Sequence, residues 1–410
     1  MSFLIVLTVI KPARKMQDRG ENTAMMGPMI VGQNAPERER LNDLALELAA
    51  ASSELRGALA DSHAGAVADL VRAMNCYYSN LIEGHDTHPV DIERALNNDF
   101  SQDPKQRELQ KEARAHIEVQ AWIDAGGIDG RATDEDALRE IHRRFCELLP
   151  EELLRVQHPE TGERVRVCPG EYRSHDVQVG RHVAVSPGAV PRFMSRFEHA
   201  YSGLGKMDRV LAAASAHHRL LWIHPWSDGN GRVARLMSYA LLRETLNTRG
   251  LWSVARGLAR NESDYKRHLA NRDLPRRNDL DGRGALSQEE LARFTAFFLS
   301  VSLDQVRFME QLIEPRGLRS RILLWAEEEM RAGRLPSHSD TLLKETLYRG
   351  EIPRGEVSTL IGTSDRTARR ATSALVGAGV LRSPSSRAPL KLAFPAALAH
   401  RWLPGLFPPG

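Results

Sequence analysis

The sequence of 410 residues lacks an apolar run long enough to span a membrane. Its apolar N-terminal stretch, residues 2–10, is far shorter than the roughly 20 residues that a transmembrane helix needs. That stretch also lacks the basic flank and the small-residue cleavage site of a secretory signal, so we expect no membrane partner. Residues 1–36 contain several methionines besides the first, and we expect this segment to be a disordered leader or a mis-annotated start.

Cysteine is also scarce, and neither sign of charge is in large excess. Cys76, Cys146 and Cys168 are widely spaced, odd in number and without a C-x-x-C pair. This pattern argues against a disulfide framework or a zinc site and predicts a cytoplasmic protein. The net charge of +3 is too small to predict nucleic-acid binding by itself. The hydrophobic content of 42% is ordinary for a globular protein.

Helical periodicity runs through most of the chain, and the length allows two or three domains. We expect a mainly α protein in which the leader is followed by three parts. These are an N-terminal helical region at residues 37–130, a helical core at residues 131–312 and a C-terminal module at residues 313–410. Short β-branched stretches at 164–167, 177–179 and 183–185 predict a small hairpin inside the core.

One loop of the core concentrates groups that bind anions. Residues 223–235 read I-H-P-W-S-D-G-N-G-R-V-A-R and lie between two segments with helical apolar spacing. Gly229 and Gly231 permit backbone angles at which successive N–H groups point the same way, and such a nest at a helix N-terminus binds phosphate. Arg232 and Arg235 are three residues apart, so their guanidinium groups can face one anion.

The same loop carries a candidate base and a candidate metal ligand. His224 is the one side chain in it that titrates near neutrality, which suits a general base. Asp228 offers the hard oxygen ligand that Mg²⁺ often combines with a phosphate. Together with the anion-binding groups, these side chains predict a site for phosphoryl or nucleotidyl transfer.

The loop resembles the signature of the Fic family, H-x-F-x-[DE]-G-N-G-R-x-x-R, with Trp226 in place of the usual Phe. The resemblance implies a Fic helical core that moves AMP from ATP to a Ser, Thr or Tyr hydroxyl of a target protein, including the chain itself. It implies that His224 is the base and that Asp228 places Mg²⁺ on the α- and β-phosphates. The residues implied to bind ATP are Asp228, Gly229, Asn230 (through its amide and its side chain), Gly231, Arg232 at the γ-phosphate, Arg235 at the β-phosphate and, at the adenine, Tyr265, for which a packed core tyrosine is the alternative.

A second motif ends an apolar helical stripe in the N-terminal region. Residues 79–84 read S-N-L-I-E-G, and Gly84 stands where a C-cap glycine is expected. The stretch is similar to the inhibitory motif of Fic proteins, [ST]-x-x-x-E-[GN]. The resemblance implies that Ser79 and Glu83 are inhibitory and that Glu83 pairs with Arg232, which withholds this guanidinium from ATP. A solvated glutamate at a helix end is the alternative.

A third motif lies at the predicted hairpin. Gly170-Glu-Tyr-Arg173, followed by Val177, Gln178 and Val179, resembles the Fic flap. The resemblance implies that these strand residues hold a target segment by main-chain pairing, which is β-strand addition. A purely structural hairpin is the alternative, and Arg173 can equally be a structural ion-pair partner.

The C-terminal module has the outline of a winged helix. Three short helical runs precede two strand-like stretches that flank a bend rich in Ser, Pro and Arg. Its last helix carries Asp365, Arg366, Arg369 and Arg370 and could enter a major groove of DNA. Protein contacts or a homodimer are the alternative role for such a module.

Other reactions remain open at this point. Some relatives within the Fic family transfer a phosphate or phosphocholine, and some remove AMP. A DNA-binding regulator with a nucleotide-sensing Fic domain is another alternative. The full G-N-G-R and the flap disfavour a toxin-like phosphotransferase that acts on translation. The sequence does not identify the target or the signal that relieves inhibition.

Overall fold

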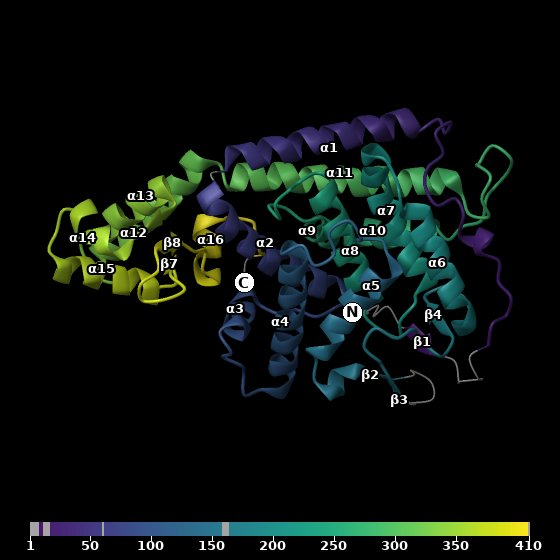
Figure 1. The fold of residues 1–410 in the computed structure, drawn as a ribbon, viewed down its shortest axis with the longest axis horizontal. Helices are drawn as coiled ribbons and strands as arrows, with labels where there is room; N and C mark the ends of the chain where they lie inside the picture. Colours follow the sequence, from purple (N-terminus) through teal and green to yellow (C-terminus); the bar gives the residue numbers. More distant parts are fainter. Residues whose placement is uncertain (1–7, 11–16, 60, 158–163, 409–410) are drawn as a thin grey trace. The chain divides into compact units, whose positions relative to one another are not determined.

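Helices dominate the structure, a computed structural model that describes residues 8–10, 17–59, 61–157 and 164–408 (Figure 1). The prediction of a mainly α protein is confirmed. The first helices are α1 (Arg38–Ala58), α2 (Asp61–Ile82), α3 (Pro89–Leu96) and α4 (Pro104–Asp124). The next are α5 (Glu135–Glu147), α6 (Val190–Tyr201), α7 (Lys206–Ile223), α8 (Asn230–Thr245), α9 (Ala255–Arg260), α10 (Glu262–Asn271) and α11 (Gln288–Leu312). The last are α12 (Pro315–Arg331), α13 (Ser339–Arg349), α14 (Val357–Leu360), α15 (Asp365–Gly377) and α16 (Ala399–Trp402).

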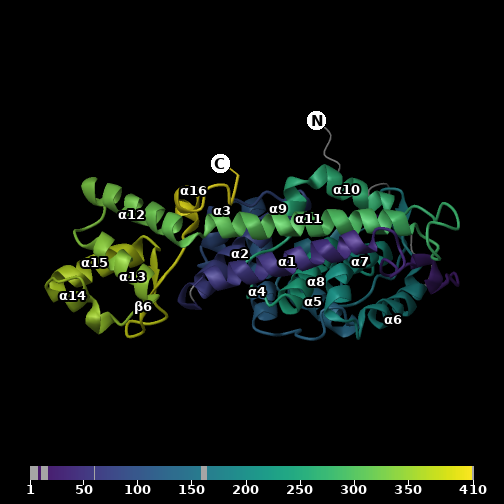
Figure 2. The same cartoon turned by 90° about the horizontal axis from the view of Figure 1, so that it is seen from above.

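The chain divides into two compact units. The first comprises residues 1–53, 75–248 and 253–305, and the second comprises residues 54–74, 249–252 and 306–410. Both views of the ribbon show α1 running alongside α11 (Figure 2). Within the described ranges, no helix has the length and apolar character needed to cross a membrane.

Two consecutive helices, α7 and α8, form the centre of the first unit. Nearly every residue of α7 from Val210 to Ile223 is buried, because α6 and α8 pack on it. Helix α8 is buried to a similar extent and also contacts α4 and α5. Helices that are apolar on most sides belong in a core, so the loop between α7 and α8 is held at both ends by packing.

Short strands interrupt this helical unit. Strands β2 (Arg155–Gln157) and β3 (Arg164–Arg166) form one antiparallel pair. A second sheet has the order β1–β4–β5, from β1 (Thr8–Ile10), β4 (Val177–Val179) and β5 (His182–Val183). The predicted hairpin is therefore present. The stretch predicted at 183–185 instead starts at His182, and Ala184 and Val185 follow the strand as buried residues.

The leader is ordered where the structure describes it beyond β1. Met26 and Val31 are buried, and the carbonyl of Met29 accepts a hydrogen bond from the Tyr201 hydroxyl at 2.8 Å. The carbonyl of Pro28 accepts one from Arg219 at 2.8 Å. The prediction of a disordered leader is therefore wrong for residues 17–36, which satisfy buried donors of the core. Residues 1–7 and 11–16 lie outside the described residues.

The second unit contains the C-terminal elements. Between α13 and the end of the module lie β6 (Glu351–Ile352), β7 (Leu381–Arg382) and β8 (Leu390–Leu392). They form an antiparallel sheet of order β6–β8–β7, in which β6 was not predicted. Leu342, Leu375 and Leu390 are buried in this unit. The predicted sequence of three helical runs and two following strands is confirmed.

Candidate active site

The loop between α7 and α8 leaves the N-terminus of α8 without a side-chain cap. Gly229 is the N-cap with a φ of 82°, a left-handed conformation that favours glycine, and no side chain caps the helix. The first N–H groups of a helix have no partner within the helix, and together with the helix dipole they attract an anion. The Asn230 side chain instead braces the loop. It accepts from the Trp226 N–H at 3.1 Å and donates to the Trp226 carbonyl at 2.9 Å. A role of this side chain in orienting the anion stays a prediction.

His224 caps the C-terminus of α7 and is held as a neutral imidazole. Its φ of 51° is left-handed, a conformation in which histidine is enriched among non-glycine residues. The ring Nδ1 lies 3.4 Å from the Leu221 carbonyl, so Nδ1 is assigned the proton and Nε2 is left as the basic nitrogen. Burial, with a further contribution from Arg173, lowers the pKa of His224 to about 3. A general base must be unprotonated before it acts, and His224 meets this condition at neutral pH.

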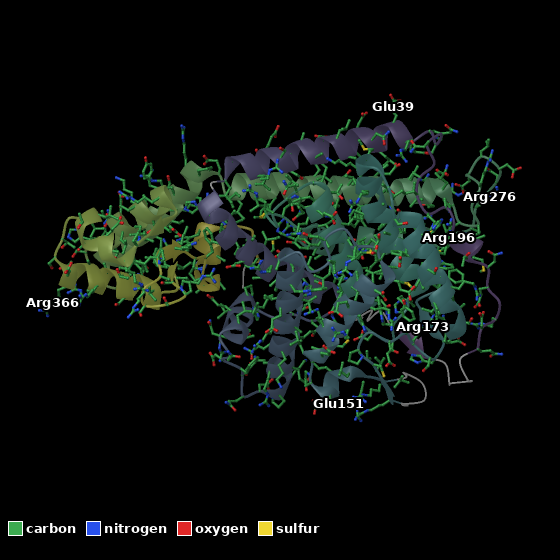
Figure 3. The ribbon with its side chains drawn as sticks, viewed as in Figure 1. Glu39, Glu151, Arg173, Arg196, Arg276 and Arg366 are labelled. Carbon is green, nitrogen blue, oxygen red and sulfur yellow. The ribbon has the colours of Figure 1, made fainter. Side chains whose placement is uncertain are left out.

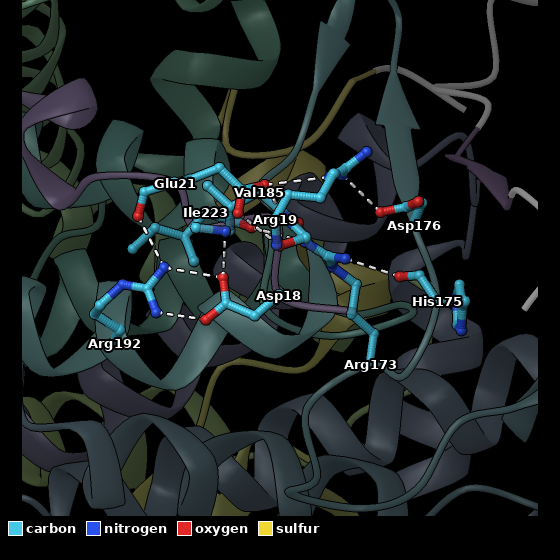
Figure 4. Close-up of polar contacts among 11 residues, drawn as sticks. Asp18, Arg19, Glu21, Arg173, His175, Asp176, Val185, Arg192 and Ile223 are labelled. Carbon is cyan, nitrogen blue, oxygen red and sulfur yellow. Dashed lines mark hydrogen bonds and ion pairs between the residues drawn. The ribbon is translucent and has the colours of Figure 1, made fainter. Parts of the chain in front are cut away.

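Arg173 donates hydrogen bonds to main-chain carbonyls at His224 and its surroundings, and Figure 4 shows it among His175, Val185 and Ile223. Its Nε donates to the His224 carbonyl at 2.7 Å, and Nη1 donates to the His175 carbonyl at 2.8 Å. Its Nη2 donates to the carbonyls of Val185 and Ile223. Burial lowers the pKa of Arg173 to about 10. Arg173 is thus a structural residue, as one alternative held, but it acts through main-chain carbonyls and not through an ion pair.

The aromatic position of the loop packs on a histidine that the sequence did not single out. Trp226 is fully buried and stacks on His142 of α5, with ring centroids 4.8 Å apart and an interplanar angle of 9°. The Nδ1 of His142 accepts from the Gly170 N–H at 2.9 Å, so Nε2 carries the proton and donates to the Asp228 carbonyl at 3.2 Å. The sequence carries no local signal for this contact.

The two predicted inhibitory residues, Ser79 and Glu83, both contact Arg235 of the anion site. Ser79 lies in α2, and its hydroxyl accepts from Arg235 Nε at 2.8 Å. Glu83 follows the end of α2, and its Oε1 lies 2.5 Å from Arg235 Nη2. The same oxygen would lie only 2.3 Å from a Cβ atom added to Gly231. The Glu83 carboxylate therefore covers the glycine face of the loop, where an anion is expected.

The expected pairing of Glu83 with Arg232 is wrong. Helix α4 places Glu112 against Arg232, with 2.6 Å between Glu112 Oε1 and Arg232 Nη2. Arg232 therefore pairs with α4, whereas Arg235 pairs with Ser79 and Glu83 at the end of α2. Burial alone would raise the pKa of Glu83, but Arg235 and Arg232 outweigh it and the pKa is lowered. Glu83 is therefore ionised at neutral pH.

Arg232 retains bonding capacity for a ligand. Its side chain is 8% exposed, and its Nη1 lies 3.6 Å from Asp228 Oδ2. The buried Nε of Arg232 has no hydrogen-bond partner in the described part of the chain. Half of the Asp228 side chain is exposed. The structure shows no group of three or more His, Cys, Asp or Glu that could bind a metal within its described ranges. Asp228 alone suits Mg²⁺ that takes its other ligands from phosphate and water.

The predicted flap is already paired with the leader. Strand β4 pairs with β1 in the register Thr8↔Val179, Val9↔Gln178 and Ile10↔Val177. Farther along the leader, Arg19 lies 2.8 Å from Asp176, and Asp18 lies 2.6 Å from Arg192 (Figure 4). The edge of β4 that the resemblance assigns to a target is thus occupied by the chain itself.

Tyr265 belongs to the core in this structure. It is 2% exposed, and its hydroxyl lies 2.6 Å from His217 Nε2. A hydrogen bond between Tyr265 and Arg235 also connects this side chain to the anion site. The burial is that of a packed tyrosine, the alternative stated for this position, and a contact with adenine stays a prediction.

Comparisons with known proteins agree with the loop motif. The model of the Fic/DOC family matches residues 132–242, which include His142 and the whole loop. Proteins called protein adenylyltransferase Fic are similar to this chain over a segment about as long as the family match. The protein from Drosophila virilis is 33% identical over 128 residues, which is 28% of this chain and 26% of that protein. The one from Culex quinquefasciatus is 34% identical over 129 residues, again 28% of this chain and 26% of that protein. The chain thus spans about a quarter of the length of these relatives.

Two solved structures whose names include Fic were also found to be similar to this chain. A Fic family protein from Desulfovibrio desulfuricans G20 is 18% identical with a TM-score of 0.48, covering 85% of this chain and 96% of that one. Fic-1 from C. elegans is 16% identical with a TM-score of 0.48, covering 68% of this chain and 76% of that one.

Proposed function

We propose that the protein is an adenylyltransferase that moves AMP from ATP to a Ser, Thr or Tyr hydroxyl of a protein, and the match of residues 132–242 to the Fic/DOC family model supports this proposal. One observation carries this proposal: a neutral His224 stands at one end of a loop whose other end is the uncapped, arginine-lined N-terminus of α8. The ionised Glu83 lies over that same site. A base, an anion site and a competing carboxylate together suit an inhibited transferase of phosphate esters.

The proposed reaction balances at the α-phosphorus. The attacking hydroxyl oxygen forms a bond to this phosphorus, its proton goes to His224 Nε2, and the bond to pyrophosphate breaks. The amides of Gly229, Asn230 and Gly231 and the forks of Arg232 and Arg235 hold the phosphate oxygens. Mg²⁺ bound at Asp228 would supply charge neutralisation for the leaving pyrophosphate. Glu83 must leave Arg235 before a triphosphate can take this fork.

The target would bind at the flap by strand addition. Main-chain pairing fixes a segment without reading much of its sequence, which suits delivery of a hydroxyl to His224. The pairing of β1 with β4 supports the capacity of this edge to hold an added strand. A target segment that uses the same register would have to displace residues 8–10.

Intact-mass measurement tests the donor and the transferred group. We expect the Glu83→Gly variant, incubated with ATP and Mg²⁺, to gain the mass of one AMP unit, and to gain nothing when EDTA is present. Addition of a single phosphate would contradict nucleotidyl transfer and favour the phosphotransferase alternative. If a protein that already carries AMP loses it instead, the reaction is AMP removal.

DNA binding by the second unit is a separate candidate function. The order α13–β6–α14–α15–β7–β8 with the sheet β6–β8–β7 supports a winged helix in this unit. Arg366, Arg369 and Arg370 of α15 are exposed (Figure 3 labels Arg366). None of the three forms an ion pair with any residue that the structure describes, which supports a role in binding an external anion such as the DNA backbone.

Charge removal on α15 tests this candidate. We expect Arg366→Ala combined with Arg369→Ala to weaken binding of the full chain to a short DNA duplex by about 10-fold or more at low salt. The slope of log Kd against log salt should fall by about one for each phosphate that the variant no longer neutralises. Fluorescence anisotropy measures both quantities. Arg331→Ala removes an exposed arginine of α12 and serves as the control. Equal Kd values for both variants would favour protein contacts as the role of this unit.

A further inference from the structure

A second carboxylate, that of the buried Glu112 of α4, contacts the anion site. Its residue is 3% exposed, and its two oxygens have different partners. Oε1 lies 2.6 Å from Arg232 Nη2, and Oε2 lies 2.7 Å from His85 Nδ1. A buried carboxylate without partners is costly, so two cationic or donating neighbours indicate a built arrangement.

His85 connects Glu112 to the helix end that carries Glu83. The N–H of His85 donates to the Asn80 carbonyl at 2.9 Å, and that of Gly84 donates to the Leu81 carbonyl at 3.0 Å. This pattern, with Gly84 at a φ of 85°, is a Schellman motif that fixes the backbone around Glu83. The hydrogen bond that His85 Nδ1 donates to Glu112 raises the pKa of His85, as expected for a contact that favours the imidazolium form.

The surroundings of Glu112 differ from those of Glu83. Glu83 lies over Gly231, and its side chain is 28% exposed at the end of α2. Glu112 is 4% exposed in the middle of the 21-residue α4. Contact with Glu112 uses only Nη2 of the Arg232 fork, and Nη1 lies 3.6 Å from the half-exposed Asp228 carboxylate, beside the loop that is expected to hold phosphate. Arg232 can therefore bind an anion while it keeps Glu112, whereas Arg235 must first release Glu83.

We propose that Glu112 is a positioning residue with two roles: it holds the Arg232 fork in place for the phosphates of the nucleotide, and through His85 it fastens the helix end that presents Glu83. The inference rests on the proposed function of the loop. It assigns opposite effects to two carboxylates of one site. Removing Glu83 opens the site to the nucleotide, whereas removing Glu112 from a chain that already lacks Glu83 weakens nucleotide binding.

The first role is tested where inhibition is already lifted. In the Glu83→Gly background, we expect Glu112→Gln to raise both the KM for ATP in self-labelling and the Kd for ATP in calorimetry by about 10-fold or more. The effect on kcat should be smaller, because Glu112 touches Arg232 and not the reacting atoms. Glu112→Asp should recover part of the loss. Glu118→Gln removes the exposed partner of Arg114 on the same helix and is the control. Unchanged KM and Kd in Glu112→Gln would overturn this role.

The second role is tested at His85, which is 40% exposed and is therefore expected to tolerate substitution. We expect His85→Ala to raise self-labelling several-fold in the otherwise unaltered chain and to have no effect in the Glu83→Gly background. This dependence on Glu83 separates a fastening role from a general change in the fold. Equal effects of His85→Ala in both backgrounds, or no effect in either, would overturn it. If Glu83→Gly itself transfers no AMP, the proposed function fails and not merely this inference.

Discussion

Replacing His224 by Asn should lower the rate of AMP transfer by about 10²–10⁴-fold, the usual contribution of a positioned general base. Asn tolerates the left-handed backbone that His224 adopts at the end of α7, so the loop should keep its shape. The affinity for ATP should change little, because the arginines and the amides of α8 remain. Labelled AMP transfer and calorimetric titration with ATP measure the two quantities on the same samples.

The pH profile gives this prediction a second readout. Burial lowers the pKa of His224 to about 3, so the imidazole is neutral at every pH above that value. We therefore expect kcat to show no loss as the pH falls from 8 to 5, in contrast to a base with the ordinary histidine pKa of about 6.5. His199→Ala, which removes an exposed histidine of α6, is the matched control. Transfer that survives in His224→Asn would remove His224 from its role.

Local backbone chemistry explains which parts of the site could be predicted from the sequence. Gly84 and Gly229 both adopt left-handed angles that glycine accepts freely, and each marks a helix end that the sequence placed correctly. The composition of the loop follows from the same requirement, since a nest of amides needs glycine at fixed positions. Such features depend on residues next to one another in the chain, and a single sequence shows them directly.

Partners that pack from distant elements could not be predicted in this way. Glu83 and Arg235 are 152 residues apart, so the choice between Arg232 and Arg235 depends on how α2 and α4 pack against α8. Glu112 and His142 carry no local signal, because a buried polar residue on an apolar helix face looks like an ordinary helical position. The leader has no periodicity, yet its carbonyls accept hydrogen bonds from Tyr201 and Arg219. Tertiary contacts of this kind override the local sequence pattern.

Replacing Glu83 by Gly should raise self-labelling with AMP by about 10- to 100-fold. The carboxylate makes a charge-assisted hydrogen bond to Arg235 inside the site. Such bonds contribute about 1.5–3 kcal/mol, which corresponds to a change of about 10- to 100-fold in the population of sites that are free of the Glu83 carboxylate. Removing it opens both the Arg235 fork and the face of Gly231 to phosphate. Because the arginines keep the pKa of Glu83 below its ordinary value, mild acid should not relieve the inhibition in the unaltered chain.

Ser79→Ala provides the graded comparison for this variant. The Ser79 hydroxyl holds Arg235 through a neutral acceptor and does not cover Gly231, so its removal should change self-labelling far less than the removal of Glu83. Adding His224→Asn to Glu83→Gly should abolish the gain, which shows that the label arises from this site. An unchanged or lower rate in Glu83→Gly would contradict inhibition by Glu83. If the variant instead loses the ability to release AMP from a modified protein, Glu83 takes part in AMP removal, because a carboxylate beside the phosphates can then orient the attacking water.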